Sequence, residues 1–264
     1  MTQKGLAQMI DGDYYSSYFN PDVVRQALRF IPGRGDIVQM AFPASGTHWM
    51  QQITQLIVHG GRSASSYREF ASRFQFLEYV GTPAGVESTQ SPRFLPTHLQ
   101  PGQITVAPEA KYIYVARNPW DVCASLYDLQ GELRGPNGGQ TFDEFVSLFL
   151  EGLAGPGDYF EHVRAAFQRK DEPNVFFVTY EEMTEDHGGV VLRLADFLGS
   201  EYCRPLRENS ELLDEIVRKS TSEYMRNMLA PPTQDVNKWL PTKAENVGTA
   251  LDAPAAKVLP PGGD

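Results

Sequence analysis

Three short runs of apolar residues divide the chain, and a stretch with helical spacing follows each of them. The runs are Asp36–Phe42, Lys111–Ala116 and Val175–Tyr180. Their apolar positions are continuous rather than alternating, which is typical of parallel strands buried on both faces of a sheet. We therefore predict that these three runs form parallel strands of one sheet.

The stretches that follow these strands have the spacing of amphipathic helices. In Trp49–His59, for example, the apolar residues recur at helical intervals and form one stripe. The predicted helices are Trp49–His59, Asp121–Leu129, Phe142–Leu153, Tyr159–Arg169, Gly188–Leu198 and Glu211–Thr221. Strands that alternate with helices indicate an α/β protein of three layers, α/β/α, around a central parallel sheet. In such sheets, ligands bind at the carboxyl ends of the strands.

Segments rich in glycine and proline do not divide the chain into clear units. Gly131–Gly139 is predicted to be a loop. Asp252–Asp264 is rich in proline, alanine and glycine, and we predict a disordered tail there. We expect a single domain over residues 1–251, followed by the tail at 252–264.

Composition narrows the class of protein. The chain has 264 residues, of which 41% are hydrophobic, enough for a substantial core. A formal net charge of -10 argues against broad binding to nucleic acid or to anionic membranes. No apolar run is long enough to span a bilayer, and no secretory signal pattern opens the chain. The two cysteines, Cys123 and Cys203, belong to no paired motif, so we expect a cytoplasmic protein.

The first strand-to-helix turn carries candidate chemistry. It reads Phe42–Trp49 (FPASGTHW), where Gly46 allows a tight turn and Ser45 and Thr47 supply hydroxyl groups. Together with the start of the following helix, these donors can bind a phosphate. An ordinary turn with serine and threonine capping explains the same residues. The Walker A pattern and the GxGxxG fingerprint are both absent, which argues against a P-loop kinase, an NTPase or a dehydrogenase.

The second strand-to-helix turn adds a permanent positive charge. Arg117 follows the second predicted strand, and Ser125 lies eight positions further on. The arginine offers a planar fork suited to phosphate, although a surface arginine beside a capping Asp121 explains the segment equally well. Together, two anion-binding turns on neighbouring strand ends match a nucleotide that is phosphorylated at its 5′ end and on its 3′ hydroxyl.

At these positions the chain resembles the cytosolic sulfotransferases. Phe42–Trp49 is similar to their first loop, Tyr-Pro-Lys-Ser-Gly-Thr-Thr-Trp, and Tyr114–Ser125 resembles their 3′-phosphate segment. Pro96–Leu99 resembles their Lys-Thr-His-Leu segment, and Val178–Met183 resembles the segment around their Tyr-Glu-Asp-Met. The match covers residues 36 to 228, with the motifs in the family's order and at its spacing.

The resemblance implies a P-loop-NTPase-like sulfotransferase fold, PAPS (3′-phosphoadenosine 5′-phosphosulfate) as donor and PAP as product. The acceptor would be a phenol, steroid, alcohol or amine, and His98 would be the catalytic base. The residues that would bind the nucleotide are Ala44, Ser45, Gly46, Thr47, His48, Trp49, Arg117, Ser125, Tyr180, Thr221 and Ser222. Sulfuryl transfer needs positioning, a base and charge stabilisation, so we expect no metal.

Several positions depart from the family's pattern. Ala44 and Pro96 stand where family members have lysines, and Glu223 replaces an aromatic residue near the adenine. The closing Arg-Lys-Gly segment is not found, and Asn237-Lys238-Trp239 is at best a fragment of it. These departures predict either a weak sulfotransferase or a protein that binds PAP, PAPS or another ligand without catalysis. The pattern identifies neither the acceptor nor the oligomeric state.

Overall fold

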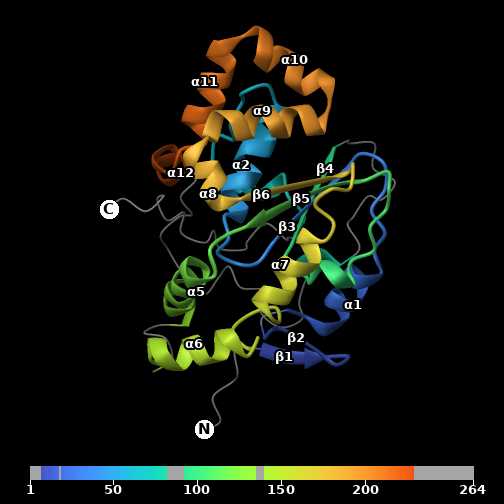
Figure 1. The fold of residues 1–264 in the computed structure, drawn as a ribbon, viewed down its shortest axis with the longest axis vertical. Coiled ribbons are helices and arrows are strands. Elements are labelled where there is room, and N and C mark those ends of the chain that lie inside the picture. The colour runs from blue at the N-terminus through green and yellow to red at the C-terminus, as the bar shows by residue number, and fades with distance from the viewer. Residues whose placement is uncertain (1–6, 18, 82–91, 135–139, 229–264) are drawn as a thin grey trace.

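A parallel sheet of four strands forms the centre of the computed structural model, which describes residues 7–17, 19–81, 92–134 and 140–228 (Figure 1). The strands are β3 (Asp36–Ala41), β4 (Arg93–Thr97), β5 (Lys111–Ala116) and β6 (Val175–Thr179), in the order β4-β3-β5-β6. β1 (Ala7–Ile10) and β2 (Asp13–Ser16) form a separate antiparallel pair. The three predicted strands are confirmed as β3, β5 and β6.

The sequence patterns did not predict β4. This strand is short and contains Pro96, which lies opposite Gln39 of β3 in the parallel register. A proline has no backbone N–H to donate to a neighbouring strand. A central strand has neighbours on both sides and does not tolerate this loss, whereas an edge strand has one side without a neighbour and does. β4 lies at the edge of the sheet, so the fold accommodates the proline there.

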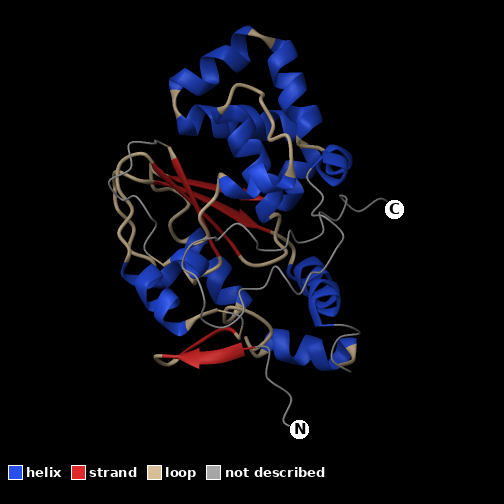
Figure 2. Ribbon diagram, turned by 180° about the vertical axis from the view of Figure 1, so that it is seen from behind, coloured by secondary structure: helices blue, strands red, loops and turns tan. Residues whose placement is uncertain are grey.

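Helices cover both faces of the sheet (Figures 1 and 2). Ile37, Ile113 and Val178 point to one side, where they pack with α2, α8 and α9. Val38 and Tyr112 point to the other side, toward α1 and α7. The bounds are α1 (Pro21–Arg29), α2 (Thr47–Val58), α3 (Tyr67–Ser72), α4 (Leu77–Val80), α5 (Pro119–Arg134), α6 (Phe142–Leu150), α7 (Tyr159–Phe167), α8 (Tyr180–Glu185), α9 (His187–Leu198), α10 (Ser200–Glu208), α11 (Ser210–Lys219) and α12 (Ser222–Met228). The three-layer α/β/α prediction is thereby confirmed.

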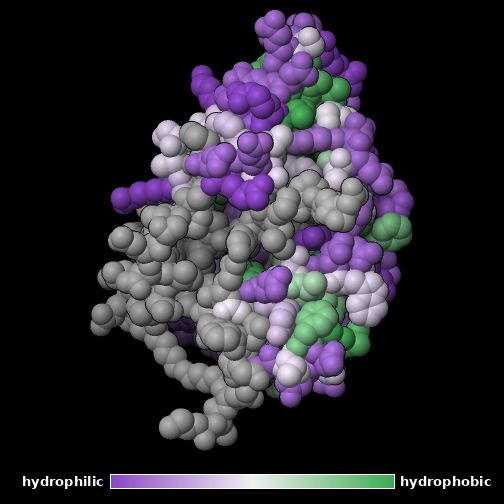
Figure 3. Space-filling model, turned by 90° about the vertical axis from the view of Figure 1, so that its left-hand side faces the viewer, coloured by the Kyte–Doolittle hydropathy of each residue, from purple (hydrophilic) through white to green (hydrophobic). Residues whose placement is uncertain are grey.

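All six predicted helices are present, as α2, α5, α6, α7, α9 and α11. The predicted loop at Gly131–Gly139 is wrong in its first part, because α5 continues to Arg134. Glu132, Leu133 and Arg134 favour a helix, and one glycine at position 131 is too small a penalty to end it. The rest of that loop, and the predicted tail at 252–264, lie outside the described residues. α10 and α11 present a mostly hydrophilic outer surface (Figure 3).

A buried ion pair joins the first residues of β3 and β4, at the end of the sheet opposite the candidate turns. The Asp36 carboxylate is 2% exposed and accepts hydrogen bonds from Arg93 Nε at 2.7 Å and Nη2 at 2.8 Å. It also accepts from the backbone N–H of Gly33 at 2.8 Å. The pair fixes the edge strand to the centre of the sheet.

Replacing Arg93 with methionine is expected to lower the free energy of unfolding by about 3–5 kcal/mol, because it leaves the Asp36 carboxylate buried without its counter-charge. Urea unfolding measures this. Arg164→Met is the matched control, since Arg164 pairs with Glu161 on the surface of α7, where such a pair contributes about 0–1 kcal/mol. Equal losses in the two variants would contradict the prediction.

Candidate functional site

The first turn, between β3 and α2, is built from left-handed backbone and buried hydroxyls. Ala44 has φ 65° and Gly46 has φ 99°, so the chain turns sharply before α2 begins at Thr47. The side-chain oxygens of Ser45 and Thr47 are buried and have no hydrogen-bond partner within the described residues. Buried hydroxyls rarely stay unpaired, so at the start of a helix these two groups fit an anion.

Glycine is required at position 46 by close packing. A β-carbon there would lie 2.8 Å from Cδ2 of Tyr180, the first residue of α8. Tyr180 therefore packs directly against the first turn. Its ring also meets Trp49 of α2 edge-on, with ring centroids 5.1 Å apart.

The second turn, between β5 and α5, is joined to the first through Arg117. Its Nη1 donates to the backbone oxygen of Ala44 at 2.9 Å and to Ser125 Oγ at 3.2 Å. Its guanidinium lies over the Tyr180 ring, 4.3 Å from the centroid. The buried Nε has no hydrogen-bond partner in the described part of the chain. The two predicted turns therefore form one site rather than two separate ones.

Thr221 and Ser222 are connected to this site less directly. Ser220 Oγ lies 2.9 Å from Nε2 of His187, and the His187 ring packs edge-on against Trp49 with centroids 5.3 Å apart. The Thr221 hydroxyl donates to the backbone oxygen of Arg218 at 2.9 Å and accepts from the Tyr224 N–H at 3.3 Å. The residue before Thr221 is thus linked to Trp49 through His187, while the Thr221 hydroxyl is engaged in local bonds.

His98 lies at the end of β4, on the strand next to the first turn. Its Nδ1 is 2.7 Å from the backbone oxygen of Ala41, which can only accept a hydrogen bond. Nδ1 therefore carries the proton, and Nε2 keeps its lone pair. Burial lowers the pKa of His98 to about 4, so the ring is neutral near neutral pH. The ring therefore has one nitrogen, Nε2, whose lone pair can accept a proton.

The comparisons with known proteins decide the family. A model of the sulfotransferase domain family matches residues 34–238. This chain belongs to the sulfotransferase family. The resemblance read from the motifs is confirmed, since an amine sulfotransferase of Oryctolagus cuniculus is 32% identical over 198 residues, and sulfotransferase 2B1 of Mus musculus is 35% identical over 198 residues. Each alignment covers 72% of this chain but only 63% and 56% of the relative, so the chain spans less than two thirds of their length.

Solved sulfotransferase structures share the fold. Mouse sulfotransferase SULT7A1 complexed with PAP matches with a TM-score of 0.66 and 24% identity, over 84% of this chain and 77% of that one. A retinol dehydratase in a complex with retinol and PAP matches with a TM-score of 0.67 and 22% identity, over 82% and 73%. The sulfotransferase fold predicted from the motifs is thereby confirmed.

Two positions of the candidate site that the sequence analysis singled out carry no charge. Ala44 and Pro96 carry no charge, and Pro96 is buried in β4. His48, at the second position of α2, lies within electrostatic reach of His98. Burial, followed by the charge of His98, lowers the pKa of His48 to about 4. Neutral donors and the single cation Arg117 therefore dominate the described part of the site.

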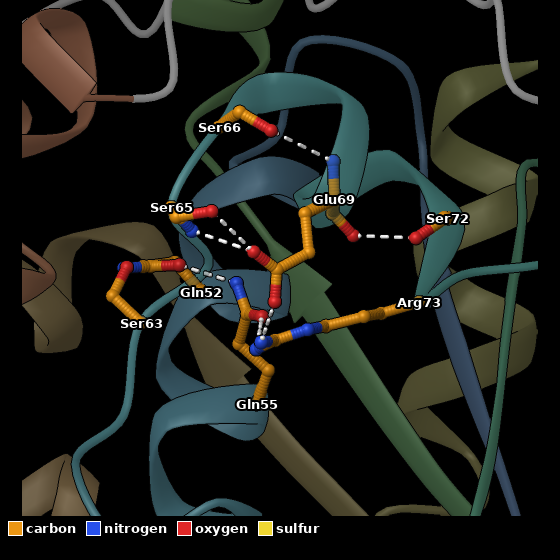
Figure 4. Close-up of polar contacts among 8 residues, drawn as sticks. All are labelled: Gln52, Gln55, Ser63, Ser65, Ser66, Glu69, Ser72 and Arg73. Atoms are coloured by element: carbon orange, nitrogen blue, oxygen red, sulfur yellow. Dashed lines mark hydrogen bonds and ion pairs between the residues drawn. The ribbon is translucent and has the colours of Figure 1, made fainter.

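A polar network that the sequence patterns did not predict holds α2 of the sulfotransferase in place (Figure 4). Gln52 donates to the backbone oxygen of Lys219, at the end of α11, at 2.9 Å, and Gln55 accepts from Arg73 at the end of α3. Arg73 also pairs with Glu69 at 2.6 Å. The sequence does carry a sign of this network, because Gln52 and Gln55 interrupt the apolar pattern of α2. Both glutamines are fully buried in the structure.

Two kinds of feature are absent from the residues that the structure describes. No group of three or more histidine, cysteine or acidic side chains there could hold a metal ion. No helix there has the length and apolar character needed to cross a membrane.

Proposed function

We propose that this chain transfers a sulfuryl group from PAPS to a hydroxyl or amine of a small molecule, such as a phenol, steroid, alcohol or amine. The observation that carries the proposal is the contact between Arg117 and Ala44, which joins two anion-binding turns into one site. The amine sulfotransferase among the relatives and the PAP in the two solved complexes support the same class of reaction.

The donor set fits a nucleotide with phosphates at both ends. The 5′ end of the nucleotide would be bound by Ser45, Thr47 and the start of α2. The buried hydroxyls of Ser45 and Thr47, which have no partner among the described residues, would donate to it. Arg117 and Ser125 would bind the 3′-phosphate. Tyr180 and Trp49, which contact each other, would lie by the adenine. When bound, PAPS supplies the sulfuryl group.

The proton of the acceptor would go to His98. Because the Ala41 carbonyl holds the proton on Nδ1, Nε2 is the atom that accepts it. The acceptor oxygen or nitrogen then forms its bond to sulfur, while the sulfur–oxygen bond to the nucleotide breaks. The hydroxyls of the first turn and the α2 amides would bind the phosphate that departs. With no cation at residue 44, we expect this transfer to be weak.

Replacing Arg117 with alanine is expected to raise the dissociation constant for PAP roughly 10–100-fold, because a hydrogen bond to a charged group contributes about 1.5–3 kcal/mol. Calorimetric titration at fixed salt measures this. Arg164→Ala, on the exposed surface of α7, is the matched control and should bind PAP like the wild type. Tighter binding of ATP than of PAP by the wild type would overturn the proposed nucleotide and favour an NTPase.

A binding protein of the same fold is the second candidate, and Ala44 and Pro96 favour it. Both positions lack the charge that stabilises the leaving phosphate in relatives. Such a protein would be stabilised against heat by PAP and would show no turnover with any acceptor. For either candidate we propose a location in the cytoplasm, which the two buried, free cysteines support.

A further inference from the structure

Glu78 is a buried carboxyl group that the proposed reaction does not use. It lies on α4 and is 1% exposed. Burying a carboxyl group is costly unless specific hydrogen bonds compensate it. One oxygen of Glu78 accepts a hydrogen bond from the backbone N–H of His98. The buried carboxyl group of α4 is therefore hydrogen-bonded to the backbone of His98, the residue proposed as the base.

α4 and its flanking residue hold His98 from one side. Phe76, which precedes the helix, packs against the His98 ring with centroids 5.4 Å apart. The Ala41 carbonyl, at the end of β3, accepts from Nδ1. The backbone, one face of the ring and one ring nitrogen are thus each fixed by a different group. Nε2 is the ring atom that these contacts leave for an acceptor.

The groups around Glu78 come from two directions. Burial raises the pKa of Glu78 to about 7, although the backbone N–H of His98, at the end of β4, donates to one carboxyl oxygen and lowers it. The other oxygen is buried and has no hydrogen-bond partner among the described residues. From α1, the neutral side chain of Gln26 packs beside Gly81, at the end of α4. Of the two arginines of α1, Arg25 and Arg29, Arg25 is engaged with Asp11 and Asp22. His98 is the titratable neighbour that Glu78 contacts directly.

We propose that Glu78 is the positioning residue of His98, one that fixes the strand end and whose negative charge stabilises the imidazolium formed when Nε2 accepts a proton. The inference rests on the proposed function in one respect: the proton that Nε2 accepts is taken to come from the sulfuryl acceptor. A carboxylate near an imidazolium favours the charged ring. A merely structural hydrogen bond would need the oxygen but not the charge, and this difference can be tested.

The sign of the pH dependence follows from the two pKa values. Above pH about 7, Glu78 is a carboxylate and supports the imidazolium; below it, Glu78 is neutral and the support is lost. His98 itself stays neutral until pH falls to about 4. Activity should therefore rise with pH through about 7, and this rise belongs to Glu78 rather than to His98.

Glu78→Gln tests the inference, because glutamine keeps the accepting oxygen and removes the charge. We expect kcat to fall about tenfold, less than the roughly 10²–10⁴-fold that a positioned general base contributes as a whole, with little change in KM and no rise in activity near pH 7. Histidine NMR, assigned with a His98→Ala sample, should show the His98 ring resonances of the wild type shifting near pH 7, where Glu78 titrates, and this shift should be absent from Glu78→Gln. Glu144→Gln, which removes a carboxylate that accepts a backbone N–H in α6, should behave as the wild type.

The NMR titration separates failure of this inference from failure of the proposed function. If the wild-type protein transferred no sulfuryl group, the proposed function would be wrong. The NMR titration of His98 would still show whether the charge of Glu78 acts on the ring. A wild-type His98 resonance that ignores the titration near pH 7 would overturn the positioning role, and this measurement needs no variant to fold. An unchanged kcat and an unchanged pH profile in Glu78→Gln would overturn it equally.

Discussion

Without the His98 imidazole, sulfuryl transfer should fall by about 10²–10⁴-fold, the range that a positioned general base contributes. The reason is geometric. The Ala41 carbonyl holds the Nδ1 proton, so Nε2 is the atom able to accept the acceptor's proton. Alanine removes that atom and leaves the nucleotide-binding turns intact. The measurement is transfer from labelled PAPS to a panel of phenols, steroids and amines by wild type and His98→Ala.

Two controls make the His98 result specific. PAP should raise the melting temperature of His98→Ala as much as that of the wild type, because Arg117, Ser45 and Thr47 are unchanged. His59→Ala, at the far end of α2, should retain full activity. If His98→Ala transferred sulfate at the wild-type rate, the base would have to be another group, and His48, which interacts electrostatically with His98, would be tested next.

The residues proposed to bind the nucleotide could be recognised as candidates from sequence because they lie close together along the chain. Ser45 and Thr47 stand in one turn, and Arg117 and Ser125 are separated by eight positions, so each pair follows from local pattern. That the two turns meet follows from parallel strands whose carboxyl ends share one edge of a sheet. The structure adds the contact itself, from Arg117 to Ala44.

The His98 side could not be predicted in the same way. β4 is an edge strand with an internal proline, so no continuous apolar run marks it. Glu78 lies in a four-residue helix, too short for a helical period to be visible in sequence. Its hydrogen bond to His98 spans twenty positions and depends on how α4 packs beside β4. Only tertiary structure brings these two residues together.

The backbone at position 44 bears on whether a missing charge can be restored. Ala44 has a left-handed φ of 65°, a conformation that costs energy for any residue with a β-carbon. Alanine already bears this cost, so an unbranched lysine adds no new backbone strain. Ala44 is also only half-buried, and its backbone oxygen, not its side chain, contacts Arg117. Lysine should therefore fit without displacing the second turn.

Replacing Ala44 with lysine is expected to raise kcat with PAPS by about 10²–10³-fold, the effect of one preorganised charge-stabilising donor. A lysine here would lie in the turn proposed to bind the 5′ end, where negative charge develops on the leaving phosphate. Single-turnover rates with the acceptor that the wild type uses best measure the gain. If the wild type has no turnover, activity that appears only in Ala44→Lys would identify a binding protein that has lost catalysis.

The controls for Ala44→Lys separate charge from bulk and from position. Ala44→Met adds a side chain of similar length without charge and should leave the rate unchanged. Gln168→Lys adds the same charge at the exposed end of α7 and should also have no effect. A gain in Ala44→Met equal to that in Ala44→Lys would mean that packing limits the reaction. No gain in Ala44→Lys would mean that transfer in this chain is limited by something other than the charge at residue 44.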